Sequence, residues 1–309
     1  MTLPAAPIQL HSTDLEASRP SQTAIASALM RAAHLLLDAP PAVLSDDLAL
    51  PLSGWKESAL IAGFAALQTK LAQETSPAEA KMLLQSVRAI TVLRARYVED
   101  LLAEAYQRGV RQYVVLGAGL DSYALRTNLE LRIFELDHPS TQGWKRERLA
   151  ALGLQTGPQH HFVPIDFEAE SPLLALARAG FRADRPSFFS WLGVINYLGQ
   201  AAIFDTLRAL AQLPRESAIV FDYVLPDHLL DAAGRRLVST LLADMSARGE
   251  PGQSFFAPEE LGQRVLSLGF GAVVDLGPEE ANARYFTGRS DGLELPRPCP
   301  AHLMHARIS

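Results

Sequence analysis

Apolar residues recur with helical periodicity through the first third of the chain and form strand-like runs after it. Between residues 21 and 109, no segment has the alternation or the β-branched content of a strand. Four prolines interrupt the helical pattern and divide it into several helices: Pro40, Pro41, Pro51 and Pro77. We therefore predict that residues 1–107 form a helical N-terminal cap.

Beyond residue 109, short β-branched and aromatic runs alternate with longer stretches rich in Ala, Leu and Arg. The runs predict strands at 112–119, 131–137, 160–166, 186–194, 217–224, 269–277 and 301–308, and the stretches predict helices at 139–153, 171–180, 199–213, 229–247 and 258–268. This order is typical of an α/β fold with a doubly wound, mostly parallel seven-stranded sheet, here over residues 108–309. The last connection is short, which favours antiparallel pairing of the last two strands.

Composition and charge narrow the class of protein. Hydrophobic residues make up 48% of the 309 residues and charged residues 20%, as in a globular protein rather than a disordered one. The net charge of −6 gives no overall attraction to phosphate backbones or anionic lipid, so neither nucleic acid nor a membrane is an expected partner. With no signal peptide and no long apolar run, we expect a cytoplasmic location. The oligomeric state is not indicated.

Metal-binding chemistry is not expected. Cys299 is the only cysteine, so the sequence allows no internal disulfide and no multi-cysteine metal site. The histidines are scattered among the predicted elements, at spacings unlike those of metal ligands. We therefore predict no metal cofactor.

A glycine loop follows the first predicted strand and suggests a ligand site. Gly117 and Gly119 would lie where the first crossover of a doubly wound sheet leaves a cleft outside the strand ends. Asp137 ends the second strand, the position from which an acid hydrogen-bonds ribose hydroxyls. Together they indicate a ligand that contains adenosine. The alternatives are a simple turn with positive φ, and Asp137 as a helix N-cap before Pro139.

The residues after the loop discriminate among adenosine ligands. A dinucleotide fingerprint has a third glycine where this chain has Ser122, and Asp121 would place negative charge where a diphosphate binds. A Walker-type Gly-Lys-Ser/Thr is also absent from the sequence. S-adenosylmethionine, a sulfonium without phosphate, meets neither objection. A nicotinamide-dependent oxidoreductase stays open as a less favoured alternative.

Several blocks in this order resemble the leucine carboxyl methyltransferase-like family of class I S-adenosylmethionine-dependent O-methyltransferases. The resemblance runs from about residue 88 to the end, and residues 1–87 match it only as a variable cap. The blocks are RARYVED (94–100), VLGAGLD (115–121) with Arg126, FELDHP (134–139) with KRER (145–148), VPID (163–166), SWLGVINYL (190–198) and GRSDG (288–292).

The resemblance implies a role for individual residues. The loop of Gly117, Ala118 and Gly119 would approach the methionine part of the cofactor, and Asp137 would hold its ribose beside His138. Asp166 would accept from the adenine amino group, with Phe167 beside the ring. Arg96, or less favourably Arg94, would pair with the cofactor carboxylate in a fork geometry. Tyr197 is the one candidate catalytic residue, with its phenol toward the substrate.

One departure from the family pattern bears on activity. Many relatives carry an acid where this chain has Leu192, so a non-catalytic cofactor-binding protein of the same fold stays open. The favoured reading is transfer of a methyl group to a carboxylate or hydroxyl of a small molecule, such as a polyketide-like metabolite, by in-line displacement. A peptide-terminus acceptor would need a polar, basic mouth that binds its carboxylate, for which the candidates are Arg126, Arg284 and Arg289. Trp55 and Phe64 would suit an apolar or aromatic acceptor, and core packing explains them as well.

Overall fold

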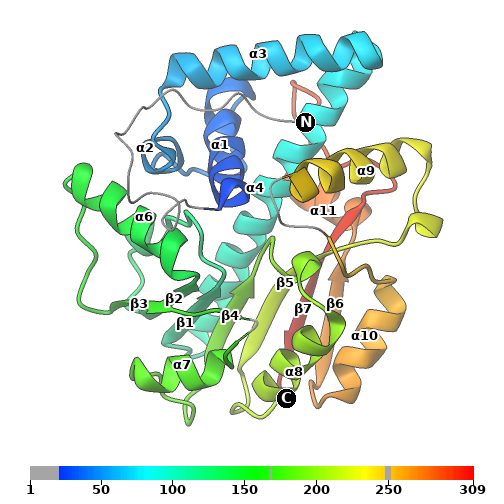
Figure 1. Cartoon of the computed structure of the whole chain (residues 1–309). Helices are drawn as coiled ribbons and strands as arrows, with labels where there is room; N and C mark the ends of the chain where they lie inside the picture. The colour runs from blue at the N-terminus through cyan, green and yellow to red at the C-terminus, as the bar shows by residue number, and fades with distance from the viewer. Residues whose placement is uncertain (1–20, 168, 248–251) are drawn as a thin grey trace.

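Each of the seven predicted strands is present in the structure, a computed structural model that describes residues 21–167, 169–247 and 252–309. The sheet has the order β3-β2-β1-β4-β5-β7-β6 (Figure 1). The strands are β1 (Gln112–Leu116), β2 (Arg132–Asp137), β3 (His160–Pro164), β4 (Ser187–Trp191), β5 (Ala218–Val224), β6 (Ala272–Leu276) and β7 (Ala301–Arg307).

The pairing of the strands confirms a doubly wound, mostly parallel sheet. Strands β3, β2, β1, β4 and β5 pair in parallel, whereas β7 lies antiparallel between β5 and β6. The order reverses between β1 and β4, because the chain first builds outward through β2 and β3 and then returns. This switch leaves a cleft at the carboxyl ends of β1 and β4, where a ligand is expected.

Within the described residues 21–111, four helices precede β1: α1 (Gln22–Leu37), α2 (Ala49–Ser53), α3 (Glu57–Glu74) and α4 (Pro77–Gln107). Figure 1 shows α1, α2 and α3 above the carboxyl end of the sheet, with α4 running from them down behind it. The side chains of α4 from Ala89 to Ala105 pack against the sheet. Helix α4 thus belongs both to the helical cap and to the core that covers the sheet. A domain boundary at residue 107 stays a prediction.

The remaining helices lie in the connections that join one strand to the next along the chain (Figure 1). Helix α11 forms in the connection between the last two strands, and α5 is a single turn directly after the glycine loop. Their bounds are α5 (Tyr123–Arg126), α6 (Pro139–Ala151), α7 (Pro172–Arg178), α8 (Gln200–Leu210), α9 (Ala232–Ala247), α10 (Pro258–Ser267) and α11 (Pro278–Tyr285), with 3₁₀ turns η2 (Ile195–Tyr197) and η3 (Asp227–Leu229).

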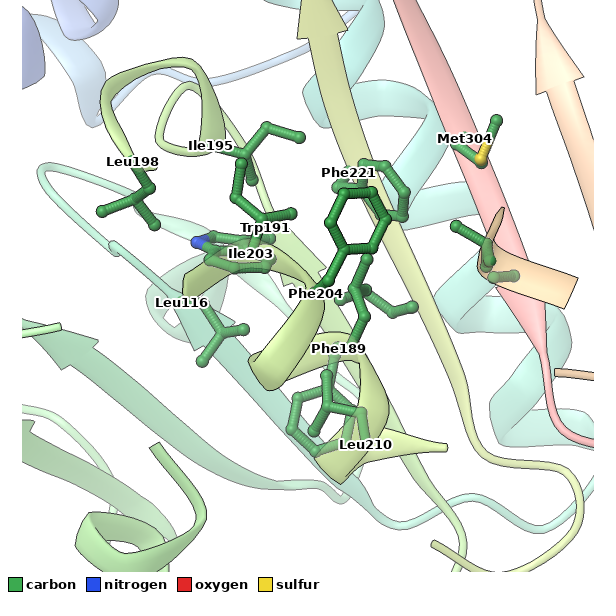
Figure 2. Packing of buried hydrophobic residues seen from close by; sticks show 14 of the residues in the cluster. Leu116, Phe189, Trp191, Ile195, Leu198, Ile203, Phe204, Leu210, Phe221 and Met304 are labelled. Atoms are coloured by element: carbon green, nitrogen blue, oxygen red, sulfur yellow. The ribbon is translucent and has the colours of Figure 1, made fainter. Parts of the chain in front are cut away.

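Alternate residues of each central strand enter different cores on the two faces of the sheet. Phe189 and Trp191 of β4 pack under α8, as Figure 2 shows, whereas Phe188 faces α4. Trp191 is fully buried, and burial of such a side chain contributes roughly 2–3 kcal/mol. These two cores fix the strand ends and hence the loops that follow them.

A buried ionic network attaches the cap to the glycine loop. Asp46 accepts hydrogen bonds from Arg31 Nε at 2.8 Å and from Ser122 Oγ at 2.6 Å, and Arg31 Nη2 donates to the carbonyl of Leu120 at 2.7 Å. Burial by itself raises the pKa of Asp46, but Arg31, Ser122 and Arg126 lower it below its ordinary value. The charged carboxylate of Asp46 therefore holds the cap against the glycine loop through Arg31 and Ser122.

Candidate functional site

A continuous cavity of about 590 Å³ lies at the carboxyl end of the sheet. The loops after β1, β2, β3 and β4 form its floor, and residues of α1, α3, α4 and α9 form its walls and roof. In a doubly wound fold this is the expected place for a ligand, because parallel strands direct their following loops to one edge.

The glycine loop lines this cavity and requires its glycines. Gly117 has a φ of +72°, and a Cβ there would lie 2.3 Å from Val194 Cγ2. Gly119 has a φ of +51°, and its Cβ would lie 3.1 Å from Ala24 Cβ of α1. The N–H groups of Gly117 and Ala118 both donate to the carbonyl of Leu136 on β2, at 2.8 and 3.0 Å. Both glycines thus have the positive φ expected of a turn, and two neighbours also approach the loop where a side chain would stand.

Asp137 lies beside this loop in the cavity wall. Its carboxylate accepts from the backbone N–H of Gly119 through Oδ2 and from that of His138 through Oδ1, at 2.6 Å for the latter. Burial raises the pKa of Asp137 above its ordinary value, although both N–H groups act to lower it. The N-cap of α6 is His138, not Asp137, so the alternative reading of Asp137 as that cap is wrong.

Asp121 and Ser122 have separate roles at the start of α5. Asp121 lines the cavity, and its Oδ1 accepts from the N–H of Tyr123 at 2.8 Å. A diphosphate at this helix terminus would meet the carboxylate instead of a free N–H group. Ser122 is buried and bonds to Asp46, so it occupies the place of a third glycine in order to hold the cap.

The two arginines of the RARYVED block lie on different sides of α4. Arg94 lines the cavity, whereas Arg96 is exposed, pairs with Asp100 at 2.8 Å and is absent from the lining. Residues two apart on a helix point about 200° apart, so only one of them can face the cavity. This corrects the expectation for Arg96: of the two candidates, Arg94 is the one that faces the cavity.

Asp222 on β5 holds Arg94 in place and was not singled out from the sequence. Its Oδ2 accepts from Arg94 Nη1 at 2.9 Å, and its Oδ1 accepts from the N–H of Gly193 at 2.6 Å. Arg94 Nη2 also donates to Ser27 Oγ at 3.0 Å. An acid inside the otherwise apolar strand AIVFDYV is the signal that would have revealed it.

The other predicted site residues also reach this cavity. They are Ala118 of the glycine loop, His138 after β2, Asp166 and Phe167 after β3, and Tyr197 on η2. Leu192 lies in the same lining and is half-buried, and the N–H of the next residue, Gly193, donates to Asp222 on β5. The roles of these residues toward a ligand stay predictions.

Several side chains considered for the acceptor are engaged elsewhere. Phe64 is buried in the core of the cap and Trp55 packs against that core, so neither lines the cavity. Arg126 pairs with Glu99, Arg284 with Asp100 and Arg289 with Asp291, and these arginines are likewise outside the lining. The expected basic mouth is therefore not formed by them.

The region of the chain described by the structure holds no cluster of three or more His, Cys, Asp or Glu side chains that would bind a metal ion. Within that same region, no helix has the length and apolar character needed to cross a membrane. His160 and His161 are outside the cavity lining. The Nε2 atom of His160 lies 3.0 Å from Oε1 of Glu135, and Glu135 also forms a buried ion pair with Lys145.

The model of the leucine carboxyl methyltransferase family matches residues 24–211, from α1 to the end of α8. The chain belongs to this family. It is an S-adenosylmethionine-dependent methyltransferase, and S-adenosylmethionine is its cofactor. The family match begins at α1, so it reaches further into the cap than the sequence motifs alone indicated.

Known proteins similar to this family member match either most of the chain or a part of it. YktD of Bacillus subtilis, which carries the provisional name S-adenosyl-L-methionine-dependent methyltransferase, is 32% identical over 306 residues, 93% of this chain and 97% of its own. A Mycobacterium tuberculosis protein with the same provisional name is 33% identical over 144 residues, 44% of this chain and 41% of its own.

Two solved structures show the same fold. A DUF574 family protein from Streptomyces avermitilis has a TM-score of 0.57 at 16% identity and covers 94% of this chain and 99% of its own. A methyltransferase from Thermobifida fusca, also provisionally named, has a TM-score of 0.53 at 17% identity, covering 96% and 97%. The methyltransferase fold is thereby confirmed.

Proposed function

We propose that this methyltransferase transfers its methyl group to an oxygen atom of a small molecule. The observation that carries the proposal is the continuity of the cavity, which joins the glycine loop, Asp137 and Arg94 to a space lined by aliphatic side chains of α3, α4 and α9. A cofactor bound at the first end would direct its methyl group toward an acceptor at the other.

Cofactor binding is assigned to the residues on the floor. The Asp137 carboxylate, held by two N–H groups, would accept from the ribose hydroxyls, and Asp166 with Phe167 would contact the adenine. Arg94, oriented by Asp222, would donate to the cofactor carboxylate. Gly117 would present its backbone to the methionine part, and Val194 occupies the place where a Cβ of residue 117 would stand.

In methyl transfer, the main task of the protein is to align the acceptor with the cofactor. When bound, the cofactor would supply a methyl group on positively charged sulfur, and an acceptor oxygen aligned with it would form the C–O bond as the C–S bond breaks and leaves its electron pair on sulfur. The walls built by the cap would hold the acceptor in line and exclude water. Tyr197 would face the acceptor from the end of the β4 block.

Other expectations join this proposal. The acceptor is proposed as the only partner, with neither nucleic acid nor a membrane involved, in keeping with the net charge of −6. The cytoplasmic location is supported by Cys299, which is free and buried. The nicotinamide alternative loses support, because Asp121 and Ser122 are committed to α5 and the cap.

The experiment is a turnover assay with S-adenosylmethionine labelled in its methyl group. Purified protein is incubated with a panel of phenols, alcohols, carboxylic acids, amines and thiols, and each labelled product is analysed by mass spectrometry. The proposal expects label on oxygen. Label on nitrogen or sulfur alone would contradict it, and cofactor binding without turnover across the panel would instead favour a non-catalytic protein.

A further inference from the structure

One face of helix α1, the first helix of the cap, lies directly over the glycine loop. The Cβ atom of Ala24 stands 3.1 Å from the place where a side chain of residue 119 would begin. Two turns further along the helix, Arg31 Nη2 donates to the carbonyl of Leu120 at 2.7 Å. Ser27 lies between these two contacts on the same face, since residues three or four apart on a helix are neighbours. It is half-buried and lines the cavity.

The hydroxyl oxygen of Ser27 accepts hydrogen bonds from two guanidinium groups. Arg31 Nη1 donates to it at 3.2 Å, and Arg94 Nη2 donates to it at 3.0 Å. Arg94 in turn crosses the loop after β4, because its Nη1 atom lies 2.9 Å from the place where a Cβ of residue 193 would stand. Ser27 is therefore joined to the loops after both β1 and β4, the two strands between which the sheet order reverses.

The hydrogen of this hydroxyl has no acceptor among the residues that the structure describes. A serine oxygen has two lone pairs and one hydrogen, and the two guanidinium groups occupy the lone pairs. Ser86 of α4, by contrast, donates its hydroxyl hydrogen to the carbonyl of Met82 at 2.8 Å, as serines in helices commonly do. Two cations that donate to one oxygen also polarise its O–H bond, which makes Ser27 a strong donor toward an anionic oxygen.

The charges around Ser27 suit a carboxylate from a ligand. Arg94 pairs with Asp222 and Arg31 pairs with Asp46, so the two cations are balanced before a ligand binds. The proposed function places the cofactor carboxylate at Arg94, and a carboxylate has two oxygens that accept about four hydrogen bonds. Because Ser27 Oγ is 3.0 Å from Arg94 Nη2, a carboxylate that accepts from this guanidinium also lies within reach of the serine hydroxyl.

We propose that Ser27 is a cofactor-binding residue supplied by the cap, and that its hydroxyl donates to the carboxylate of S-adenosylmethionine. The inference rests on the proposed function, which assigns Arg94 to the same carboxylate. The cofactor is then held between α1 and the loops at the carboxyl end of the sheet. The cap therefore completes the cofactor site in addition to enclosing the acceptor.

The experiment compares two ligands that differ only in this carboxylate: S-adenosylhomocysteine and its decarboxylated analogue. Calorimetry measures the binding of each ligand to the full chain and to Ser27→Ala. We expect Ser27→Ala to weaken the binding of S-adenosylhomocysteine about tenfold, because a hydrogen bond to a charged group is lost. The affinity for the decarboxylated analogue should not change, since that ligand offers the hydroxyl no carboxylate.

Two further variants separate direct contact from other roles. Ser86→Ala removes the same hydroxyl from a buried position outside the lining, and both affinities should stay as in the wild type. Ser27→Ala is also made in the Arg94→Ala background. A hydroxyl that donates to the carboxylate itself gives a further loss of at least threefold for S-adenosylhomocysteine there, whereas a serine that only orients Arg94 gives none.

Three results would overturn the inference while leaving the cofactor site of the proposed function in place. They are unchanged binding of S-adenosylhomocysteine by Ser27→Ala, an equal loss for both ligands, and no further loss in the Arg94→Ala background. If the wild-type chain binds neither ligand, cofactor use by this cavity is refuted, and the inference falls with it.

Discussion

Replacement of Gly117 by alanine tests whether the glycine loop is shaped by the contact with Val194. Two separate costs arise, because the backbone has a φ of +72° and the new Cβ would lie 2.3 Å from Val194 Cγ2. The conformation itself costs about 1–2 kcal/mol for a residue with a side chain. Relief of the overlap requires the loop or Val194 to move, and such overpacking costs about 1–3 kcal/mol more.

Gly153 supplies the matched control. Its φ is +66°, and a Cβ there would meet nothing within 4 Å, so Gly153→Ala carries only the conformational cost. We expect Gly117→Ala to lower the free energy of unfolding by about 1–3 kcal/mol more than Gly153→Ala does, as measured by urea denaturation. The displaced loop should also weaken binding of S-adenosylhomocysteine, which Gly153→Ala should not affect.

A second substitution isolates the steric part of the effect. Val194→Ala removes Cγ2 and leaves Val194 Cβ at 3.5 Å, an ordinary contact distance. In that background, Gly117→Ala should cost no more than Gly153→Ala does. The reasoning is refuted if Gly117→Ala and Gly153→Ala are equally destabilising in the wild-type background and both bind S-adenosylhomocysteine normally.

Further substitutions probe the site and the sheet. In calorimetry, Arg94→Ala should weaken the binding of S-adenosylhomocysteine at least tenfold but leave the binding of 5′-methylthioadenosine, which lacks the amino acid part, unaffected. Arg96→Ala should change neither affinity. A loss of binding in Arg96→Ala would restore the original assignment to Arg96. Asp222→Asn should produce the same split between the two ligands, because Asp222 positions Arg94; equal loss of both ligands would indicate a purely structural role. Burial, with Arg108 and Arg307 nearby, lowers the pKa of His305 to about 4. As pH falls below about 6.5, His305 therefore takes up a proton in the unfolded chain before it does so in the folded chain. The free energy of unfolding should drop by about 2 kcal/mol between pH 7 and pH 5. His305→Leu should remove most of that drop in urea titrations, and an unchanged pH dependence would count against it.

Local patterns were sufficient to predict the sheet and the floor of the site. The strands are apolar runs bounded by glycine, proline or acidic residues. The loop at 117–119 comes directly after one of these runs, and Asp137 is the last residue of another. Such features depend on neighbours along the chain, and so the sequence alone reveals them. The short connection between β6 and β7 likewise predicted their antiparallel pairing.

Features that depend on tertiary packing were predicted less well. Arg94 and Arg96 belong to one helical block, and only the packing of α4 decides which of them faces the cavity. Phe64 suited either an apolar acceptor or a core and is buried in the cap, whereas Leu83 lines the cavity. Apolar periodicity identifies an apolar face without saying whether a core or a cavity covers it. Asp222 was overlooked because its partner lies on a distant helix.

The most direct test of the central claim is calorimetric titration of S-adenosylmethionine and S-adenosylhomocysteine into the wild-type chain and into Asp137→Ala. We expect micromolar binding by the wild type and a loss of at least tenfold in the variant, because Asp137 is the carboxylate assigned to the ribose. Circular dichroism and urea denaturation of the variant would verify that it remains folded. Binding of equal strength by both proteins, or no binding by the wild type, would contradict the assignment of this cavity as the cofactor site.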